Sequence, residues 1–120
     1  MAKANTNRKP IVWMGSSLND VKDVRKFSES AKREAGHQLD RVQSGLEPDD
    51  WSPFDTVGSG TKEIRINLDD GWFRVMYVAK FGEAVYVLHC FRKKSNKTST
   101  NDIEIAKTRY KHVLQERRAK

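Results

Sequence analysis

Basic residues recur along the second half of the chain at positions where they can gather around one surface. Arg65 and Arg74 lie on successive strand-like segments, and the next segment runs into a basic stretch at residues 92–97. A guanidinium offers a planar fork of donors to phosphate oxygens, and a lysine adds a compact ammonium charge. This pattern indicates a surface that binds, and can cleave, a phosphodiester backbone.

Cleavage of RNA at such a surface needs no metal ion. The 2′-hydroxyl attacks the adjacent phosphate, so the protein must supply a base, cationic stabilisation of the oxyanion and an acid for the leaving oxygen. A lysine crowded by other cations gives up its proton more readily, which makes Lys93 or Lys94 a candidate acid or base. Arg65 and Arg74 suit charge stabilisation, and His89 is the remaining candidate for proton transfer. These five residues are the candidate catalytic set.

Neighbouring residues can hold the rest of an RNA strand. The aromatic rings of Trp72 and Phe91 can stack on bases, as aromatic side chains do in proteins that bind single-stranded RNA. Lys62, Arg92 and Lys97 are candidates for contacts with the backbone phosphates. We therefore expect an RNA-binding surface around the catalytic set.

Each pattern also has a purely structural interpretation. Arg65 and Arg74 can simply solvate an exposed sheet face, and residues 92–97 can form an ordinary basic loop. A histidine within an apolar strand, such as His89, is more often packed and hydrogen-bonded than catalytic. Cys90, expected to point inward, is interpreted as a small core residue. Pattern alone leaves both interpretations open.

Three strands are expected to position the basic residues. Alternating and apolar patterns predict strands over residues 62–68, 72–79 and 84–91, and the turn-like residues 69–71 and 81–83 separate them. Short separators of this kind are typical of an antiparallel meander.

Side-chain alternation predicts which residues of the meander share a face. It places Arg65, Arg74, His89 and Phe91 together on an exposed face, opposite the face that packs against helices. In the third strand, the same rule directs Tyr86, Leu88 and Cys90 toward the helices.

The remaining segments predict the rest of the domain. Residues 9–14 form a short strand, residues 18–27 and 31–46 two amphipathic helices, residues 47–60 a connecting loop and residues 101–117 a C-terminal helix. The expected fold is therefore a small α+β domain, with an antiparallel sheet of the short N-terminal strand plus the three-strand meander, packed against two N-terminal helices and a C-terminal helix.

Composition limits the possible functions. The 120 residues have a mass of 13.8 kDa, enough for one domain, which we expect over residues 9–120 after a disordered tail at 1–8. A net charge of +7 favours a polyanionic partner such as nucleic acid. One cysteine, no signal peptide and no apolar run long enough for a membrane span predict a cytoplasmic protein. The three histidines are scattered, and no phosphate-binding glycine loop occurs, so we expect no metal and no cofactor.

The order and spacing of several motifs resemble those of the phage-related HigB-like toxins of the RelE/ParE superfamily. The resemblance covers nearly the whole chain. The motifs are KPIVWMGSS (9–17), GHQLDRVQSG (36–45), GSGTKEIRI (58–66), WFRVMY (72–77), VYVLHCFRKKSNKT (85–98) and DIEIAKTRY (102–110).

This resemblance implies the toxin of a type II toxin–antitoxin module. Such a toxin is neutralised by a helix-turn-helix antitoxin and, in the RelE and HigB branches, inhibits translation as an mRNA interferase, a metal-independent endoribonuclease that cuts mRNA on the ribosome. By the family pattern, Arg65 and Arg74 correspond to basic residues of the central strands, and Lys93 and Lys94 to the basic position after the last strand. The chain departs from the RelE pattern at Glu63, where RelE has a lysine, and it has no clear match for the C-terminal catalytic tyrosine of RelE.

Two other functions are compatible with the same scaffold. A ParE-like toxin binds and poisons DNA gyrase instead of cutting RNA, and a non-catalytic regulatory module binds nucleic acid through charge alone. The predicted fold does not choose among these functions.

Overall fold

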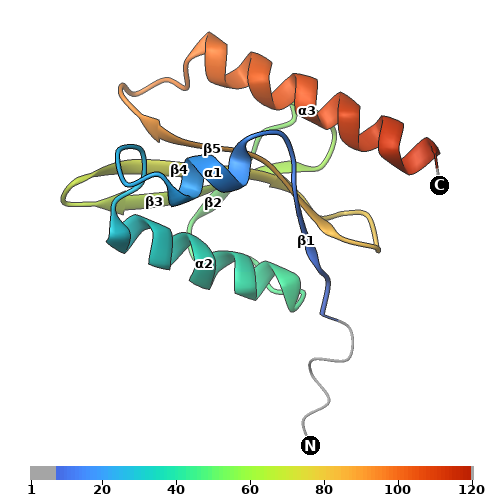
Figure 1. Ribbon diagram of the computed structural model, residues 1–120, viewed down its shortest axis with the longest axis horizontal. Coiled ribbons are helices and arrows are strands. Elements are labelled where there is room, and N and C mark those ends of the chain that lie inside the picture. Colours follow the sequence, from blue (N-terminus) through green and yellow to red (C-terminus); the bar gives the residue numbers. More distant parts are fainter. Residues whose placement is uncertain (1–7, 120) are drawn as a thin grey trace, which may run out of the picture.

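The computed structural model describes residues 8–119 and confirms the α+β fold (Figure 1). Residues 1–7 of the predicted tail lie outside the described residues, whereas Arg8 donates hydrogen bonds to the side chains of Ser44 and Gln43. The elements in chain order are β1 (Ile11–Trp13), α1 (Ser17–Lys22), α2 (Glu29–Gln43), β2 (Trp51–Pro53), β3 (Thr61–Leu68), β4 (Gly71–Val78), β5 (Val85–Lys93) and α3 (Thr100–Arg118).

The strands form one sheet in the order β1-β5-β4-β3-β2. The antiparallel meander of β3, β4 and β5 is confirmed, but β1 pairs with β5 in parallel, so the sheet is mixed. The segment expected to be a loop contains β2, which pairs with residues 62–64 of β3. Sequence reasoning missed β2 because it is three residues long and ends in a proline, a residue typical of sheet edges.

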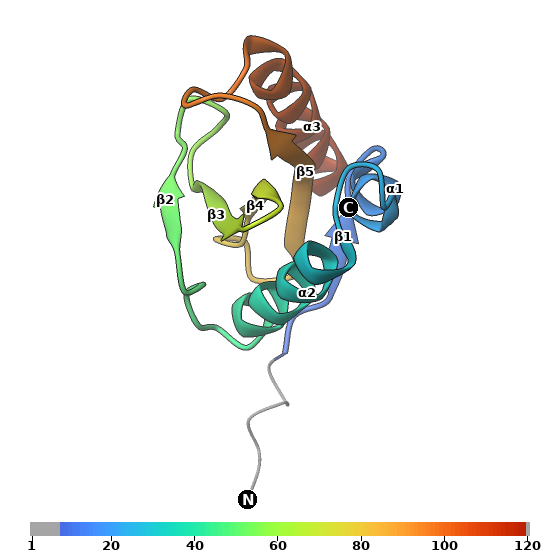
Figure 2. The same cartoon turned by 90° about the vertical axis from the view of Figure 1, so that its left-hand side faces the viewer.

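Helices cover both faces of the sheet (Figures 1 and 2). On one face α1 and α2 pack against the sheet, and on the other face α3 does, which gives two layers of core. The first layer includes Phe27, Leu39, Ile64, Phe73 and Tyr77, and the second includes Met76, Tyr86, Leu88, Tyr110 and Val113. The face expected to be exposed is therefore partly covered by α3.

Local hydrogen bonds set the helix boundaries. The first helix ends at Lys22, earlier than predicted, because the backbone turns at Asp23, whose carboxylate accepts a hydrogen bond from the N–H of Arg25 at 2.9 Å. Ser28 and Ser99 cap α2 and α3 with their hydroxyl oxygens. Ser99 caps the last helix, so α3 begins slightly before the predicted position. None of the described helices is long and apolar enough to cross a membrane.

A β-bulge changes the alternation in β5. Met76 of β4 lies opposite His89 and Tyr77 lies opposite Val87, so Leu88 is an extra residue on β5. The prediction that Tyr86 and Leu88 share a face with Cys90 is therefore wrong: Tyr86 and Leu88 pack beneath α3, whereas Cys90 packs on the other side.

The predicted shared face of the basic residues is confirmed by the strand register. Arg65 lies opposite Arg74, and Arg74 lies opposite Phe91. The next row contains Glu63, Met76 and His89, so His89 lies on the same face. Burial differs from the expectation, however, because Arg74 is 4% exposed and His89 is 5% exposed.

Glu63 and Arg74 are opposite charges buried together in this face. Glu63 is also 4% exposed, and its Oε1 lies 3.9 Å from Nε of Arg74. The guanidinium donates hydrogen bonds to Oδ1 of Asn67 at 2.8 Å and to the carbonyl oxygen of Phe73 at 2.9 Å. Burial raises the pKa of Glu63, and the nearby charge of Arg74 opposes that rise. Each charge therefore depends on the other to remain buried.

We expect Arg74→Met to lower the free energy of unfolding by about 3–5 kcal/mol, because it leaves the carboxylate of Glu63 buried without its partner. The double variant Glu63→Leu with Arg74→Met should be less destabilised than Arg74→Met alone. Urea unfolding followed by circular dichroism measures both. A double variant as unstable as the sum of the two single variants would show that the pair is not coupled.

Candidate functional site

A cationic pocket of about 530 Å³ lies beside the last part of β5. Its walls come from α1, the connection that follows α1, the end of β5, the connection after β5 and the start of α3. Two acids, Asp20 and Asp102, line it together with His89. The lysines and arginines that line it are Arg25, Lys26, Arg92, Lys93, Lys94, Lys97 and Arg109.

The pocket exists because β1 is short. β1 pairs only with residues 85–87 of β5, so residues 88–93 have a strand neighbour on one side only. Helices α1 and α3 contact β5 from its two faces, and the space beyond β1 stays open between them. The edge of β5 thus becomes the floor of a pocket.

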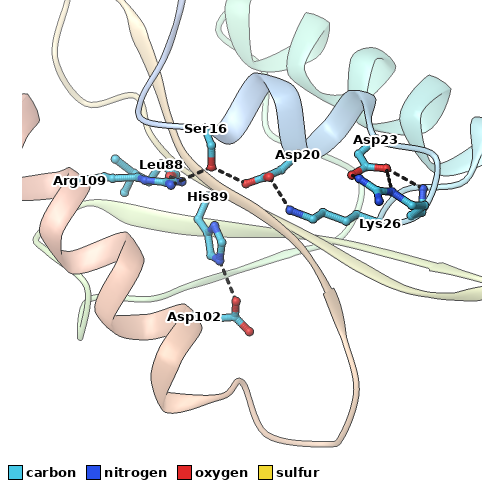
Figure 3. Close-up of polar contacts among 9 residues, drawn as sticks. Ser16, Asp20, Asp23, Lys26, Leu88, His89, Asp102 and Arg109 are labelled. Atoms are coloured by element: carbon cyan, nitrogen blue, oxygen red, sulfur yellow. Dashed lines mark hydrogen bonds and ion pairs between the residues drawn. The ribbon is translucent and has the colours of Figure 1, made fainter.

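A histidine–aspartate pair lies at this floor (Figure 3). Nε2 of His89 lies 2.7 Å from Oδ1 of Asp102, and the ring stacks on Phe91 at a centroid distance of 4.8 Å. The other carboxylate oxygen of Asp102 accepts a hydrogen bond from the Ser99 hydroxyl at 2.7 Å. Because a carboxylate accepts, Nε2 carries the proton in the neutral ring and Nδ1 carries the lone pair.

The surroundings of His89 favour its neutral form. Burial lowers the pKa of His89, while the hydrogen bond and charge of Asp102 act in the opposite direction. The net direction is downward, so the imidazole is neutral at pH 7. Nδ1 is buried and has no hydrogen-bond partner among residues 8–119. His89 is therefore an acceptor held in one orientation.

A second polar network joins α1 to α3 across the pocket (Figure 3). Arg109 donates to the carbonyl oxygen of Leu88 and to the Ser16 hydroxyl, each at 3.0 Å. Ser16 in turn donates to Asp20 at 2.9 Å, and Lys26 donates to the other oxygen of Asp20 at 2.8 Å. This network fixes one wall of the pocket.

Asp20, the acid of this network, already has its partners. Burial works against the charged form of Asp20, but hydrogen bonds from Lys26 and Ser16 outweigh it and hold the pKa of Asp20 below its ordinary value. By contrast, within the described part of the chain no carboxylate forms an ion pair with Lys93, Lys94 or Lys97. Arg92 and Arg109 also form no ion pair there, but their guanidinium groups donate to backbone carbonyl oxygens. Among the described residues, these three lysines are therefore the pocket cations left for a ligand.

The structure brings most of the sequence-predicted residues together. The pocket is lined by His89, Phe91, Arg92, Lys93, Lys94 and Lys97. Trp72 lies beside it, in a shallow hollow shared with Arg92, Lys93 and Lys94.

The three remaining predicted residues lie outside the pocket. Arg65 forms an ion pair with Asp50 at 2.9 Å, and Arg74 is buried beside Glu63. Lys62 pairs with Glu47 at 2.8 Å, and its ammonium lies 4.4 Å from the ring centroid of Trp51. These contacts stabilise the sheet and its β2 edge.

Sequence reasoning missed several pocket residues. Two of them, Asp102 and Arg109, could have been found from sequence patterns. Ser99 followed three residues later by an acid is typical of a helix N-terminus, which places Asp102 just after β5. Asp102, Ile105 and Arg109 recur at helical spacing and all line the pocket. Ser16, Asp20 and Lys26 reach it only through the packing of α1, which no local pattern predicts.

We expect the pKa of His89 to lie below 6.5 and to fall further in Asp102→Asn, because that change removes the charge that favours the protonated ring. An NMR titration of the imidazole resonances measures both values. Asp55→Asn, which alters an exposed loop acid, should leave the His89 titration unchanged. A rise of the pKa in Asp102→Asn would contradict the assigned contact.

The chain matches a protein family over a segment that includes most of this site. Residues 22–111, three quarters of the chain, match the family model described as Phage derived protein Gp49-like (DUF891). The matched segment contains α2, four of the five strands and the part of α3 that lines the pocket. No curated protein is similar enough in sequence to be matched with the chain. The chain therefore belongs to the Gp49-like family of phage-derived proteins, a family of RelE-like, toxin-like proteins.

Proposed function

We propose that the chain is the HigB-like toxin of a type II toxin–antitoxin module and that it cleaves mRNA on the ribosome without a metal ion. The observation that carries this proposal is the meeting of three lysines without ion-pair partners and a neutral, oriented histidine in one pocket. Membership in a toxin-like family supports the same conclusion.

Lys93, Lys94 and Lys97 supply the binding energy for the RNA backbone. Because these ammonium groups have no ion-pair partners among the described residues, binding of a phosphate breaks no internal ion pair. Lys93 continues β5 and is held by the sheet, whereas Lys94 and Lys97 lie in the exposed connection to α3. Lys93 and Lys94 stabilise charge on the reacting phosphate, and one of them donates the proton to the leaving oxygen.

His89 acts as the base that accepts the proton of the 2′-hydroxyl. Its Nδ1 carries the lone pair but is buried, so the neighbouring side chains must move before the reacting hydroxyl reaches that atom from the pocket that His89 lines. Asp102 is a positioning residue, because it fixes the tautomer and stabilises the imidazolium that forms. Arg65 and Arg74 lie one row farther along the sheet, so their contribution is indirect.

A helix-turn-helix antitoxin is the partner that this proposal implies. An acidic segment of such a partner would cover the pocket lysines and block access of RNA to His89. The antitoxin thus competes with the substrate for the same charges.

We expect brief induction of the wild-type chain, in a host without the antitoxin, to produce new mRNA 5′ ends within translated codons. His89→Gln should reduce their yield about 10²–10⁴-fold, because it removes the base but preserves a polar side chain of similar size. The matched control His37→Gln, at an exposed position of α2, should behave as wild type. Circular dichroism of the purified variants checks folding.

The same experiment separates the alternatives. Full cleavage by a folded His89→Gln variant would remove His89 from the mechanism. Growth arrest with intact mRNA and a DNA-damage response would favour inhibition of gyrase. Normal growth during overproduction would favour a non-catalytic nucleic-acid-binding module.

We expect Lys93→Ala with Lys94→Ala to weaken binding of single-stranded RNA and to flatten its salt dependence. Each lost phosphate contact should reduce the slope of log K against log salt concentration by about 0.7. The control pair Lys107→Ala with Lys111→Ala changes the same net charge on residues of α3 outside the pocket. Equal slopes for the two double variants, measured by fluorescence anisotropy, would show that net charge and not the pocket binds RNA.

A further inference from the structure

Trp72 is a large apolar side chain left exposed beside the cationic pocket. It is 44% exposed at the start of β4, where it lies opposite Asn67 on one side and Lys93 on the other. The hollow that it lines also contains Arg25, Arg92 and Lys94. Four of the residues around this indole are therefore cations.

The faces of the Trp72 ring have no charged or aromatic partner in the described part of the chain. Over residues 8–119, no cation and no aromatic ring stacks on Trp72, whereas Lys62 covers Trp51. Arg92 is held elsewhere, because its guanidinium donates to the carbonyl oxygen of Asp70 and lies 5.5 Å from the ring of Phe73. The indole thus offers its surface to solvent beside Arg92, whose position is fixed by other contacts.

The register places this ring on the same face as the pocket floor. Trp72 pairs with Lys93, two positions beyond Phe91 and four beyond His89 along β5. At about 3.3 Å per residue and about 5 Å between strands, Trp72 lies roughly 14 Å from the His89 backbone. Lys93 and Lys94 line both the pocket and the hollow, so the two spaces form one cationic track.

We propose that Trp72 is a stacking site for a base of single-stranded RNA, adjacent to the subsite where the phosphate is cut. An indole between cations fits a nucleotide, because the ring stacks on the base while the cations bind the phosphates on either side. The inference rests on the proposed function, since it extends the same RNA strand from the pocket onto β4.

The test compares the binding of two probes of equal length, an oligouridylate and an oligonucleotide without bases. The protein carries His89→Gln, so that neither probe is cleaved. Trp72→Ala should weaken binding of the oligouridylate about 5- to 100-fold and leave binding of the base-free probe unchanged. Trp72→Phe should retain most of the affinity, because it keeps an aromatic ring. Leu46→Ala, at another exposed apolar residue, is the matched control and should have no effect.

A direct readout accompanies the affinities. In protein labelled with 5-fluorotryptophan, the ¹⁹F signal that is lost in Trp72→Phe should shift with the oligouridylate and not with the base-free probe. Equal effects of Trp72→Ala on the two probes, or no effect on either, would overturn the stacking site. In that case, RNA binding that still depends on Lys93 and Lys94 would preserve the proposed function. Failure of both probes to bind in a manner that depends on those lysines would overturn the proposed function itself.

Discussion

A three-residue strand, β1, leaves residues 88–93 of β5 with a strand neighbour on one side only, and the candidate site depends on that gap. A longer β1 would hydrogen-bond to residues 88–93 and fill the space between α1 and α3. The gap instead admits the side chain of Arg109, which donates to the carbonyl oxygen of Leu88 on β5 and to the Ser16 hydroxyl. Gly15 permits this arrangement, because a Cβ at that position would collide with the guanidinium of Arg109. The backbone of the N-terminal segment therefore shapes a site whose unpaired lysines come from the second half of the chain.

The distribution of ion pairs explains how a net charge of +7 becomes a local feature. Asp20 partners Lys26, Glu63 lies beside Arg74, Asp50 partners Arg65 and Glu47 partners Lys62. These acids neutralise cations that stabilise the fold. Lys93, at the end of β5, and Lys94 and Lys97, which follow it, have no such partners among the described residues, so their field is directed into the pocket. Whether a cation has an acidic partner, more than its charge alone, therefore distinguishes the cations available for binding from those that stabilise the fold.

Much of the fold could be predicted from the sequence because its signals are local. Alternation along β3 and β4 and the short turns between strands predicted the meander, and the meander brought Arg65, Arg74, His89 and Phe91 to one face. The burial of His89 depends on α3 folding back over that face, which is a long-range packing event. No local pattern predicted that Arg74 would be buried beside Glu63. The basic stretch at the end of β5 could be predicted from the sequence as part of the site, whereas the wall that α1 contributes could not. Spacing along one element predicts a face, but it does not predict what covers that face.

Because of the extra residue in β5, the number of residues in this strand decides which side chains face the pocket. Leu88 and His89 both point toward α3 because the bulge interrupts alternation between them. In a regular strand, the imidazole would turn into the layer of core beneath α2, away from Asp102 and from the lysines. A deletion or insertion of one residue in this strand would therefore move each later side chain of the strand to the opposite face of the sheet, even if every side chain were retained. Among related chains, the number of residues between the start of β5 and its histidine is thus as informative as the identity of the histidine.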